Sequence, residues 1–470
     1  MVTQIAPTVP TSAAQEVRPS RFTYAVPHDD GGLVVYNSMR GAITYVPAAH
    51  ADAARGLLGN RSAVHRVDDL PAELRPMLDG LVARGFLVPG SEDEMEQAAT
   101  LRDERVARTD RLELILMPTE SCNFRCTYCY EDFGLDRMLT GVQRGVTELV
   151  RRRHEETGLS SLSVSWFGGE PLVALDVVEN LSEFFLDYCA ENGIAYAAGM
   201  TTNGYLLTPE TARRVTELEV RSFQVTLDGP RHTHDDTRSL MGGHGSFDTI
   251  MDNLRGLADD PELDFDVMLR TNFTPENVGS VPSLVQEIGE IAARDDRFSV
   301  IFRPVGRWGG PDDDAISACT GKDAELLKLD LNRHASDAGM GVGDTRMLRP
   351  GGTVCYAANP WSLVVRPNGL LNKCTVALRM AENLVGRLVP DGTLEINDQR
   401  MALWTENDET QDSGCRSCSF RPSCQGAHCP LIRVQDGVRP CPSVKTWIGA
   451  NLQTFADLQS QGVAVVGGVA

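Results

Sequence analysis

The chain of 470 residues is long enough for about three domains, and its apolar fraction of 42 % is typical of a globular protein with real cores. A formal net charge of −21 argues against nucleic acid as a partner, because phosphates attract basic surfaces. No run of about eighteen apolar residues occurs, so no membrane-spanning helix is predicted. Twelve cysteines without a secretory signal favour a cytoplasmic protein whose thiols bind metal.

Residues 1–20 are rich in Pro, Thr, Ala and Ser and are expected to form a flexible tail. A small α+β unit is predicted after it, over residues 21–98, from short apolar runs followed by longer periodic ones. The expected strands are Phe22–Val26, Leu33–Tyr36 and Ala42–Val46, and the expected helices are Ala49–Leu58 and Pro71–Arg84. Charged residues from Glu92 to Arg108 predict a helix that links this unit to the next.

From Leu112 onward, apolar strands alternate with segments long enough for helices. The expected strands are Leu112–Met117, Leu162–Phe167, Ala195–Thr201, Ser222–Leu227, Phe265–Arg270 and Phe298–Arg303. The expected helices include Thr140–Glu156, Val173–Asn192 and Val278–Arg294. Such alternation predicts parallel strands joined by right-handed crossovers, and therefore an open barrel of six strand–helix units. Barrels of this kind carry their sites at the carboxyl ends of the strands.

Three cysteines follow the first of these strands in a C-x3-C-x2-C spacing, Cys122, Cys126 and Cys129. Soft thiolates this close together in a loop suit an iron–sulfur cluster, and three thiolates would leave one iron of a four-iron cluster open. A zinc knuckle is the alternative, but it usually needs a fourth Cys or His nearby. No such residue follows closely in the sequence.

The next four strands also end in residues that suit a ligand. Glycines at strand ends allow a ligand to approach the backbone closely, and polar side chains stand beside them. The candidates are Gly168, Gly169 and Glu170 after the second strand, Asn203 after the third, Thr226 and Asp228 after the fourth, and Arg270 on the fifth. Each motif alone would be explained by turn chemistry, but four successive ones together with the cysteines favour a binding site.

Asp312–Gly343 shows no strand pattern and is expected to be a connecting helical segment that contains Cys319. Cysteines then recur in the last quarter of the chain. They are Cys355, Cys374, Cys415, Cys418, Cys424, Cys429 and Cys441. Four-thiolate sites suit zinc as well as iron, so spacing alone leaves two structural zinc sites as an alternative. Of the two remaining cysteines, Cys189 lies in an apolar helical pattern and is expected to be a buried thiol.

The cysteine loop and the Gly168-Gly169-Glu170-Pro171 run resemble the radical S-adenosylmethionine (radical SAM) family. The resemblance implies that the open iron chelates SAM, and that Gly168, Gly169 and Glu170 hold its amino group. Asn203, Thr226, Asp228 and Arg270 correspond to ribose or carboxylate contacts, Arg238 to an ion pair with the SAM carboxylate, and Tyr128 to an aromatic near the adenine.

The C-terminal cysteines resemble the SPASM extension of that family, which binds two auxiliary clusters and would bring the total to three [4Fe-4S] clusters. The resemblance assigns Cys355, Cys374 and Cys429 to the first auxiliary cluster. It assigns Cys415, Cys418, Cys424 and Cys441 to the second. Four residues separate Cys424 from Cys429 where the family pattern has three, which is a departure at Cys429.

The resemblance implies a peptide-modifying enzyme with five parts after its tail. These are a winged-helix-like domain at 21–98 that binds the leader of a ribosomally made precursor, a partial (β/α)6 barrel at 99–310, a connecting segment at 311–344, a SPASM domain at 345–450 and a C-terminal tail at 451–470. A flavodoxin or ferredoxin would supply electrons. The expected product is a crosslink, with a thioether favoured over a carbon–carbon or carbon–oxygen bond.

The thioether depends on an open iron in the first auxiliary cluster, because the run before Cys355 lacks an eighth cysteine; Cys319 is the competing ligand. Two other functions remain alternatives. One is a sulfatase-maturase-like enzyme that makes formylglycine, although Thr375 stands where that family has a catalytic Asp. The other is a non-catalytic protein that binds zinc or peptides.

Overall fold

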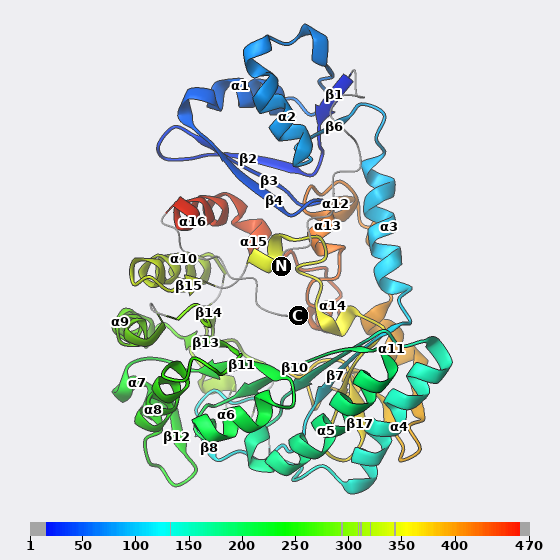
Figure 1. Cartoon of the computed structure of the whole chain (residues 1–470), viewed down its shortest axis with the longest axis vertical. Coiled ribbons are helices and arrows are strands. Elements are labelled where there is room, and N and C mark those ends of the chain that lie inside the picture. Colours follow the sequence, from blue (N-terminus) through cyan, green and yellow to red (C-terminus); the bar gives the residue numbers. More distant parts are fainter. Residues whose placement is uncertain are drawn as a thin grey trace.

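The computed structural model describes residues 16–131, 133–292, 295–308, 310, 313–319, 321–342 and 345–460. Figure 1 shows a small lobe formed by the first strands and helices, a long helix descending from it, and a larger lobe built on one sheet. The short helices of the C-terminal region lie between the two lobes.

The N-terminal lobe holds two three-stranded sheets, β2-β3-β4 and β5-β1-β6, with helices α1 and α2. Their bounds are β1 Glu16–Pro19, β2 Thr23–Pro27, β3 Leu33–Asn37, β4 Ala42–Val46, β5 His65–Arg66, β6 Leu87–Pro89, α1 Ala48–Leu58 and α2 Arg75–Ala83. The expected strands and helices of this unit are therefore present. The tail expected over residues 1–20 ends earlier, because β1 pairs with both β5 and β6 and buries Val17 in the lobe's core. Residues 1–15 lie outside the described part of the chain.

Helix α3, Glu94–Val106, joins the two lobes and begins at Asp93, whose carboxylate accepts hydrogen bonds from the Met95 and Glu96 amides. This N-cap satisfies amides that have no partner within the helix. The helix then runs beside the C-terminal region (Figure 1), where Arg102 Nη1 lies 2.7 Å from Glu409 Oε2. Arg105 Nε donates to Gln425 Oε1 at 2.6 Å, so the linking helix is fixed to the cysteine-rich segment.

Six parallel strands, β7, β9, β10, β11, β13 and β14, lie side by side in the order of the sequence, as the alternating pattern predicts. The helices between them cover one face of this sheet (Figure 1). The bounds are β7 Arg111–Leu116, β9 Ser161–Trp166, β10 Ala195–Thr202, β11 Val220–Thr226, β13 Asp266–Phe273, β14 Phe298–Pro304, α4 Thr140–Thr157, α5 Leu175–Asn192, α6 Pro209–Thr216, α7 Arg231–Thr237, α8 Phe247–Ala258 and α9 Val281–Ala292. The expected α/β fold class, with six parallel strands joined through helical segments, is confirmed.

The barrel sheet continues at both edges into an eleven-stranded sheet. At one edge β15, Gly341–Val342, pairs parallel to β14, so the expectation of no strand within Asp312–Gly343 is wrong. At the other edge β16 pairs parallel to β7, with Leu363 opposite Leu114. An antiparallel meander follows, and its strands are β16 Ser362–Val365, β17 Leu370–Asn372, β18 Leu384–Leu388 and β19 Leu394–Ile396. The cysteine-rich region is therefore hydrogen-bonded to the barrel.

The remaining helices connect these parts. They are α10 Gly321–Asp337, α11 Asp398–Thr405, α12 Ser413–Arg416, α13 Arg421–Cys424, α14 Pro430–Asp436, α15 Ser443–Thr446 and α16 Ile448–Ser460. Helix α10 confirms a helical connection. The tail expected over residues 451–470 is wrong for its first half, because α16 buries Leu452 and Phe455 and contacts α10 and β3. Residues 461–470 lie outside the described part.

Candidate active site

The cysteine loop is held by a two-stranded ribbon that the sequence pattern did not predict. Strand β8, Phe124–Cys126, pairs antiparallel to β12, Arg238–Leu240, and Cys126 lies opposite Arg238. Burial raises the pKa of Cys122 and of Cys129 to about 12, and the nearby Cys126 thiol adds to each rise. The fold therefore brings these three thiols together. Thiols bind iron as thiolates, so loading the site would release their protons.

The Gly168-Gly169 turn packs against the segment that leads into the cysteine loop. The Gly169 amide donates to Thr119 O at 3.3 Å and the Glu170 amide to Ser121 O at 3.0 Å. Gly168 has a φ of +118°. A Cβ at Gly168 or Gly169 would overlap the main-chain oxygens of Thr119 or Ser121, so both positions require glycine. The close approach fixes the turn against the cysteine loop.

Glu170 is fully buried, and its carboxylate ties the second strand end to the third. Oε1 accepts from the Leu172 amide at 3.1 Å and from Thr202 Oγ1 at 2.8 Å, and Oε2 accepts from the Asn203 amide at 2.7 Å. Burial raises the pKa of Glu170, although these bonds oppose the rise. A carboxylate can accept about four hydrogen bonds, so room for one more donor remains, and contact with the SAM amino group stays a prediction.

Asn203 lies next to the first thiol. Its Nδ2 donates to Asn123 Oδ1 at 2.8 Å and lies 3.8 Å from Cys122 Sγ. Its Oδ1 accepts from the Tyr205 amide at 3.0 Å. The predicted ligand residue after the third strand therefore stands at the cysteine loop, in contact with the residues that shape it.

A buried polar network joins the predicted residues of the fourth and fifth strand ends. The Tyr128 hydroxyl donates to Asp228 Oδ2 and accepts from Arg238 Nη1 at 2.8 Å. The side-chain Nδ2 of Asn272 donates to the Tyr128 hydroxyl at 3.1 Å, and the main-chain N–H of Asn272 donates to Asp228 Oδ1 at 3.0 Å. Arg270 Nε donates to Asn272 Oδ1 at 2.8 Å. Asn272 was not among the predicted site residues, although its position two residues after Arg270 places it on the same face of the strand.

Arg238 combines two features that fit an anionic ligand. Its Nε is buried without a hydrogen-bond partner among the described residues, and its guanidinium lies 5.6 Å from the centre of the Phe124 ring. Burial lowers the pKa of Arg238, but the charges of Cys126, Tyr128 and Asp228 outweigh it and hold the pKa well above its ordinary value. Thr226 is buried at the end of β11, opposite Arg270 in the sheet register.

The fold also brings Cys355, Cys374 and Cys429 together. Burial raises the pKa of Cys355 to about 12, and the Cys374 and Cys429 thiols add to the rise. The Cys374 loop is held by Asn383, whose Oδ1 accepts from the Cys374 amide at 2.8 Å and whose Nδ2 donates to Cys374 O at 2.7 Å. Cys429 has a φ of 43°, which lies in the left-handed region.

A second C-terminal group contains Cys415, Cys418 and Cys424. Burial raises the pKa of Cys415 to about 11, and the Asp412, Cys424 and Cys418 charges contribute. Lys445 links Cys441 to this group, because its Nζ lies 3.2 Å from Cys441 Sγ and also interacts electrostatically with Cys418.

The two remaining thiols lie apart from all three groups. Cys189 is buried in α5, as predicted. The charges that act on Cys319 come from Glu276 and Asp323.

Among the residues that the structure describes, no three His, Cys, Asp or Glu side chains converge closely enough to hold one metal ion. Ligands of a four-iron cluster bind different iron atoms, so they surround a larger volume than the ligands of a single ion do. None of the helices described here is both long and apolar enough to span a bilayer.

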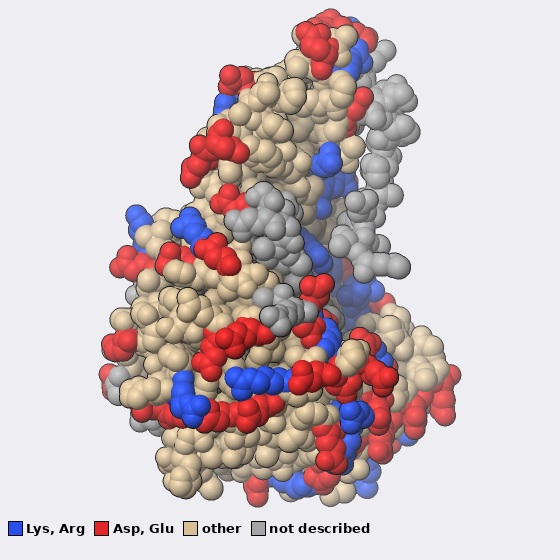
Figure 2. Space-filling model, turned by 60° about the vertical axis from the view of Figure 1, so that its left-hand side comes forward, with Lys and Arg blue, Asp and Glu red and all other residues tan. Residues whose placement is uncertain are grey.

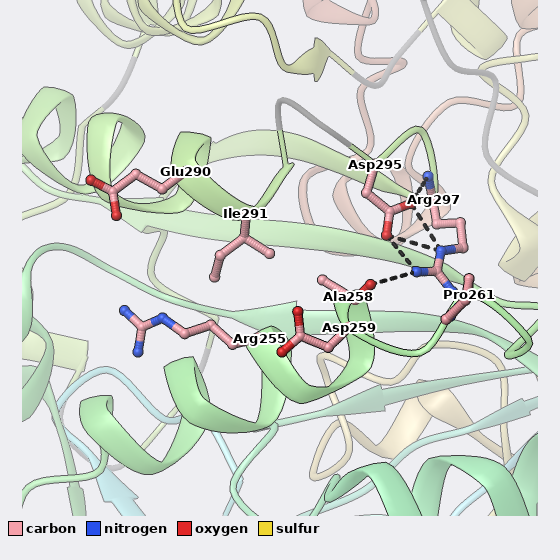
Figure 3. Close-up of a pocket in the computed structure, with 8 residues that line it drawn as sticks. All are labelled: Arg255, Ala258, Asp259, Pro261, Glu290, Ile291, Asp295 and Arg297. Carbon is pink, nitrogen blue, oxygen red and sulfur yellow. Dashed lines mark hydrogen bonds and ion pairs between the residues drawn. The ribbon is translucent and has the colours of Figure 1, made fainter.

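An open pocket of about 560 Å³ lies at the opposite end of the barrel (Figure 3). It is lined by the ends of α8 and α9 and by the segments that follow them, including Arg255, Asp259 and Glu290. The guanidinium of Arg297 donates hydrogen bonds there to the Asp295 carboxylate and to main-chain oxygens such as Asp260 O at 2.7 Å. These residues precede the strands, whereas the thiols and the polar network lie where strands end, so this pocket is not the candidate site.

Residues 116–260 match the family model described as the radical SAM superfamily. The radical SAM cyclopropyl synthase TigE of Paramaledivibacter caminithermalis is 20 % identical over 272 residues, which cover 51 % of this chain and 56 % of that protein. The mycofactocin maturase MftC of Mycolicibacterium smegmatis is 24 % identical over 333 residues, which cover 66 % of this chain and 75 % of that protein.

Native anSMEcpe, solved with bound AdoMet and Cp18Cys peptide, shares the fold with a TM-score of 0.53 and 16 % identity, over 74 % of this chain and 98 % of that one. The match to TigE spans only about half of that protein's length, and the match to the Fe-coproporphyrin III synthase of Methanosarcina barkeri spans 39 %. Residues 116–260 therefore form a radical SAM domain.

Proposed function

We propose that this chain binds SAM and three [4Fe-4S] clusters and modifies a ribosomally made precursor peptide. The observation that carries the proposal is the grouping of ten cysteines into three sets around one continuous sheet. The sets are Cys122, Cys126 and Cys129; Cys355, Cys374 and Cys429; and Cys415, Cys418, Cys424 and Cys441. The first set stands at the carboxyl end of β7, where a barrel of this kind carries its site.

A reduced cluster on the first set would supply the electron that splits the S–C bond of SAM into methionine and a 5′-deoxyadenosyl radical. The residues of this chain hold the substrate of that step. Arg238, with its unpartnered buried Nε, would bind the SAM carboxylate, and the spare acceptor capacity of Glu170 would take the amino group. The polar network of Tyr128, Asp228 and Asn272 holds Arg238 in position through the Tyr128 hydroxyl. Because these groups are buried and already positioned, they add orientation and exclude water.

A peptide substrate is supported by the relatives. The mycofactocin maturase matches 66 % of this chain, and the anSMEcpe fold was solved with a peptide bound. In the N-terminal lobe, β4 pairs with β3 on one side and with no other strand among the described residues. An extended leader peptide would add to this free edge through main-chain hydrogen bonds. The leader site is therefore proposed at Ala42–Val46.

The product we favour is a thioether crosslink. Cys319 lies near Glu276 and Asp323, and the charges on Cys355 come from Cys374, Cys429 and Glu113. This separation supports a first auxiliary cluster with three protein thiolates and one exchangeable iron, where a substrate thiolate would bind. A sulfur held there would be close to a carbon radical formed beside the first set. Flavodoxin or ferredoxin is the proposed electron donor.

Formylglycine formation is the less favoured function. The position after Cys374 is Thr375, whose hydroxyl lies 3.0 Å from the Tyr356 hydroxyl and whose amide donates to the same oxygen at 2.9 Å. This position therefore offers no carboxylate to act as a base.

The test uses anaerobically purified protein, SAM and dithionite, with 5′-deoxyadenosine measured by chromatography. Replacing Cys122, Cys126 and Cys129 together by Ala is expected to abolish 5′-deoxyadenosine while iron and sulfide remain on the other seven cysteines. The matched control is Cys189→Ala, which removes a thiol that belongs to none of the three sets. Continued 5′-deoxyadenosine formation by the triple variant would overturn the proposal, as would purification of the wild type with zinc and without iron.

A further inference from the structure

His234 on helix α7 is fully buried, and its imidazole makes hydrogen bonds to two other segments of the barrel. Nδ1 accepts from the main-chain N–H of Asp228 at 3.3 Å, and Nε2 lies 3.1 Å from Ser246 Oγ. The Ser246 hydroxyl donates in turn to the main-chain oxygen of Arg238 at 2.8 Å. His234 therefore joins Asp228 and Arg238, two residues of the candidate active site, through their main-chain groups.

These contacts fix the tautomer of His234. A serine hydroxyl has one proton to donate, and Ser246 gives it to Arg238 O, so Ser246 accepts the proton of His234 Nε2. Nδ1 is then the acceptor for the Asp228 N–H. Burial holds the pKa of His234 well below its ordinary value, and the positive charge of Arg238 acts in the same direction. The imidazole is therefore neutral and uses both of its nitrogens.

The main chain of Arg238 is held on both sides by this arrangement. Its N–H donates to His234 O at the end of α7, and its oxygen accepts from Ser246 Oγ. Asp235, the next residue of α7, fixes Ser246 because its Oδ1 accepts from the Ser246 main-chain N–H at 2.7 Å. The place of Arg238 in the site thus depends on His234 and on the serine that His234 contacts.

The side chain of Arg238 closes a cycle of hydrogen bonds that begins and ends at His234. Nη1 donates to the Tyr128 hydroxyl at 2.8 Å, that hydroxyl donates to the Asp228 carboxylate, and the Asp228 N–H donates to His234. The Nε of Arg238 stays buried without a hydrogen-bond partner among the described residues. The cycle therefore holds the guanidinium in place and leaves Nε for a ligand.

The protein surface as a whole does not attract a carboxylate. The chain carries a net charge of −21, and Asp and Glu spread over the barrel half of the face shown in Figure 2. Recognition of a carboxylate must then come from a short-range contact. A guanidinium makes such a contact well only when its planar N–H groups are correctly oriented, so a small displacement of Arg238 is expected to weaken it.

We propose that His234 is a positioning residue for SAM: it holds Arg238 where the guanidinium can bind the methionyl carboxylate. This inference rests on the proposed function, in which Arg238 binds that carboxylate. His234 itself does not contact the ligand in this arrangement. Its effect on SAM affinity should therefore pass through Arg238 and through the carboxylate alone.

The test measures binding of SAM and of decarboxylated SAM, which lacks only the carboxylate, to the oxidised holoenzyme by anaerobic equilibrium dialysis. His234→Leu removes both ring nitrogens and is expected to lower SAM affinity about fivefold, the size of one lost hydrogen bond. Its affinity for decarboxylated SAM is expected to change less than about twofold, because Arg238 has no carboxylate to bind there. His234→Gln keeps an amide N–H that can donate to Ser246 and is expected to recover part of the loss.

Two further variants isolate the route. In the Arg238→Gln background, His234→Leu is expected to change SAM affinity by less than about twofold, since the contact that it positions is already lost. The matched control is His154→Leu. His154 lies on α4 with Nδ1 3.1 Å from the Tyr188 hydroxyl. This control is expected to leave the affinity for both ligands unchanged.

Unchanged SAM affinity in His234→Leu would overturn the proposal. Equal losses for SAM and decarboxylated SAM, or the same loss with and without Arg238, would also overturn it and leave His234 a packing role only. Iron content and circular dichroism identify a variant that does not fold. Ser246→Ala, which cuts the link to Arg238 O and keeps His234, then decides the outcome by the same two affinities. None of these measurements needs SAM cleavage, so 5′-deoxyadenosine formation by the wild type tests the proposed function separately.

Discussion

The Ser38 hydroxyl donates to the main-chain oxygen of Ser419 at 2.6 Å, although 381 residues separate the two in the chain. Beside it, the Tyr36 hydroxyl donates to Leu348 O at 2.7 Å and lies 2.9 Å from Ser423 Oγ. The N-terminal lobe is thus docked on the segment that carries Cys418 and Cys424. Removing the whole lobe would expose that segment as well as the proposed leader site, so single substitutions are the cleaner experiment.

We expect Tyr36→Phe to lower the free energy of unfolding by about 1–2 kcal/mol, because it removes the shorter of the two hydrogen bonds to the Leu348 carbonyl and leaves only the one from Ser423 Oγ at 3.4 Å. The matched control is Tyr24→Phe. Tyr24 stacks on Tyr36 with ring centres 5.9 Å apart, and its hydroxyl makes no hydrogen bond with a described residue. Anaerobic urea unfolding followed by circular dichroism measures both. Equal losses in the two variants would show that the Tyr36 hydrogen bond is not what holds the lobes together.

We expect Asn383→Leu to reduce the iron bound by the Cys355, Cys374 and Cys429 set, because the Asn383 side chain makes hydrogen bonds to both sides of the Cys374 peptide. Losing these buried bonds costs about 1–3 kcal/mol for each unsatisfied group. Asn372→Leu is the control, since the Asn372 amide is fully buried and has no partner among the described residues. Iron analysis and auxiliary-cluster spectra are the measurements. Similar iron loss in both variants would contradict the role given to Asn383.

We expect Arg238→Gln to weaken SAM binding by about tenfold or more through loss of a charge-assisted contact. Ser239→Ala, on the next residue of β12, is the control for the β8–β12 ribbon. Isothermal titration of the oxidised protein with SAM measures the affinity, and retention of iron on the first set reports that the ribbon is intact. Unchanged affinity in Arg238→Gln would remove Arg238 from the SAM site.

Lys373 predicts a pH dependence of stability. Its Nζ is buried and donates to Asn359 O at 2.7 Å and to Ser362 O, and burial lowers its pKa to about 7. Because the unfolded chain keeps this proton up to about pH 10.4, it binds more protons than the folded chain above pH 7. This group's contribution to stability should therefore increase from pH 7 to 9, by up to about 1.4 kcal/mol for each pH unit.

The comparison is between wild type and Lys373→Met, with unfolding measured at several pH values in this range. The difference isolates Lys373 from other groups that titrate there. Parallel pH profiles for the two proteins would show that Lys373 keeps an ordinary pKa.

Periodicity predicted the six barrel strands because each carries four or more consecutive residues that are buried or half-buried against helices. Cysteine spacing predicted the set of Cys122, Cys126 and Cys129, whereas the division of the seven C-terminal cysteines came from the resemblance to the SPASM extension, and their roles as cluster ligands stay predictions. The β8–β12 ribbon was missed because each strand has only three residues, too few to show a period of two. The position of Asn272 inside the polar network depends on Tyr128, which lies 144 residues earlier, and no local pattern encodes that contact.

The errors at the two ends of the chain have a similar cause. Strand β1 is only four residues long and gains its partners from β5 and β6, about fifty and seventy residues later. Helix α16 has apolar residues at Leu452 and Phe455, but its burial depends on α10 and β3. Strand β16 joins β7 from 250 residues away, a pairing that hydrophobic pattern alone does not specify.

The pairing of β16 with β7 fixes the position of the strand that leads into the first thiol set relative to the strand that leads toward the first C-terminal set. Met117 N donates to Val365 O and Glu113 N to Trp361 O, each at 3.0 Å, so the strand that leads into the cysteine loop and the strand that leads toward Cys374 cannot slide past one another without breaking a ladder. A hinge motion between the barrel and the C-terminal region at this edge would have to break these hydrogen bonds. In the function proposed above, an opening that admits a peptide would leave this ladder intact only if it came from segments outside the sheet.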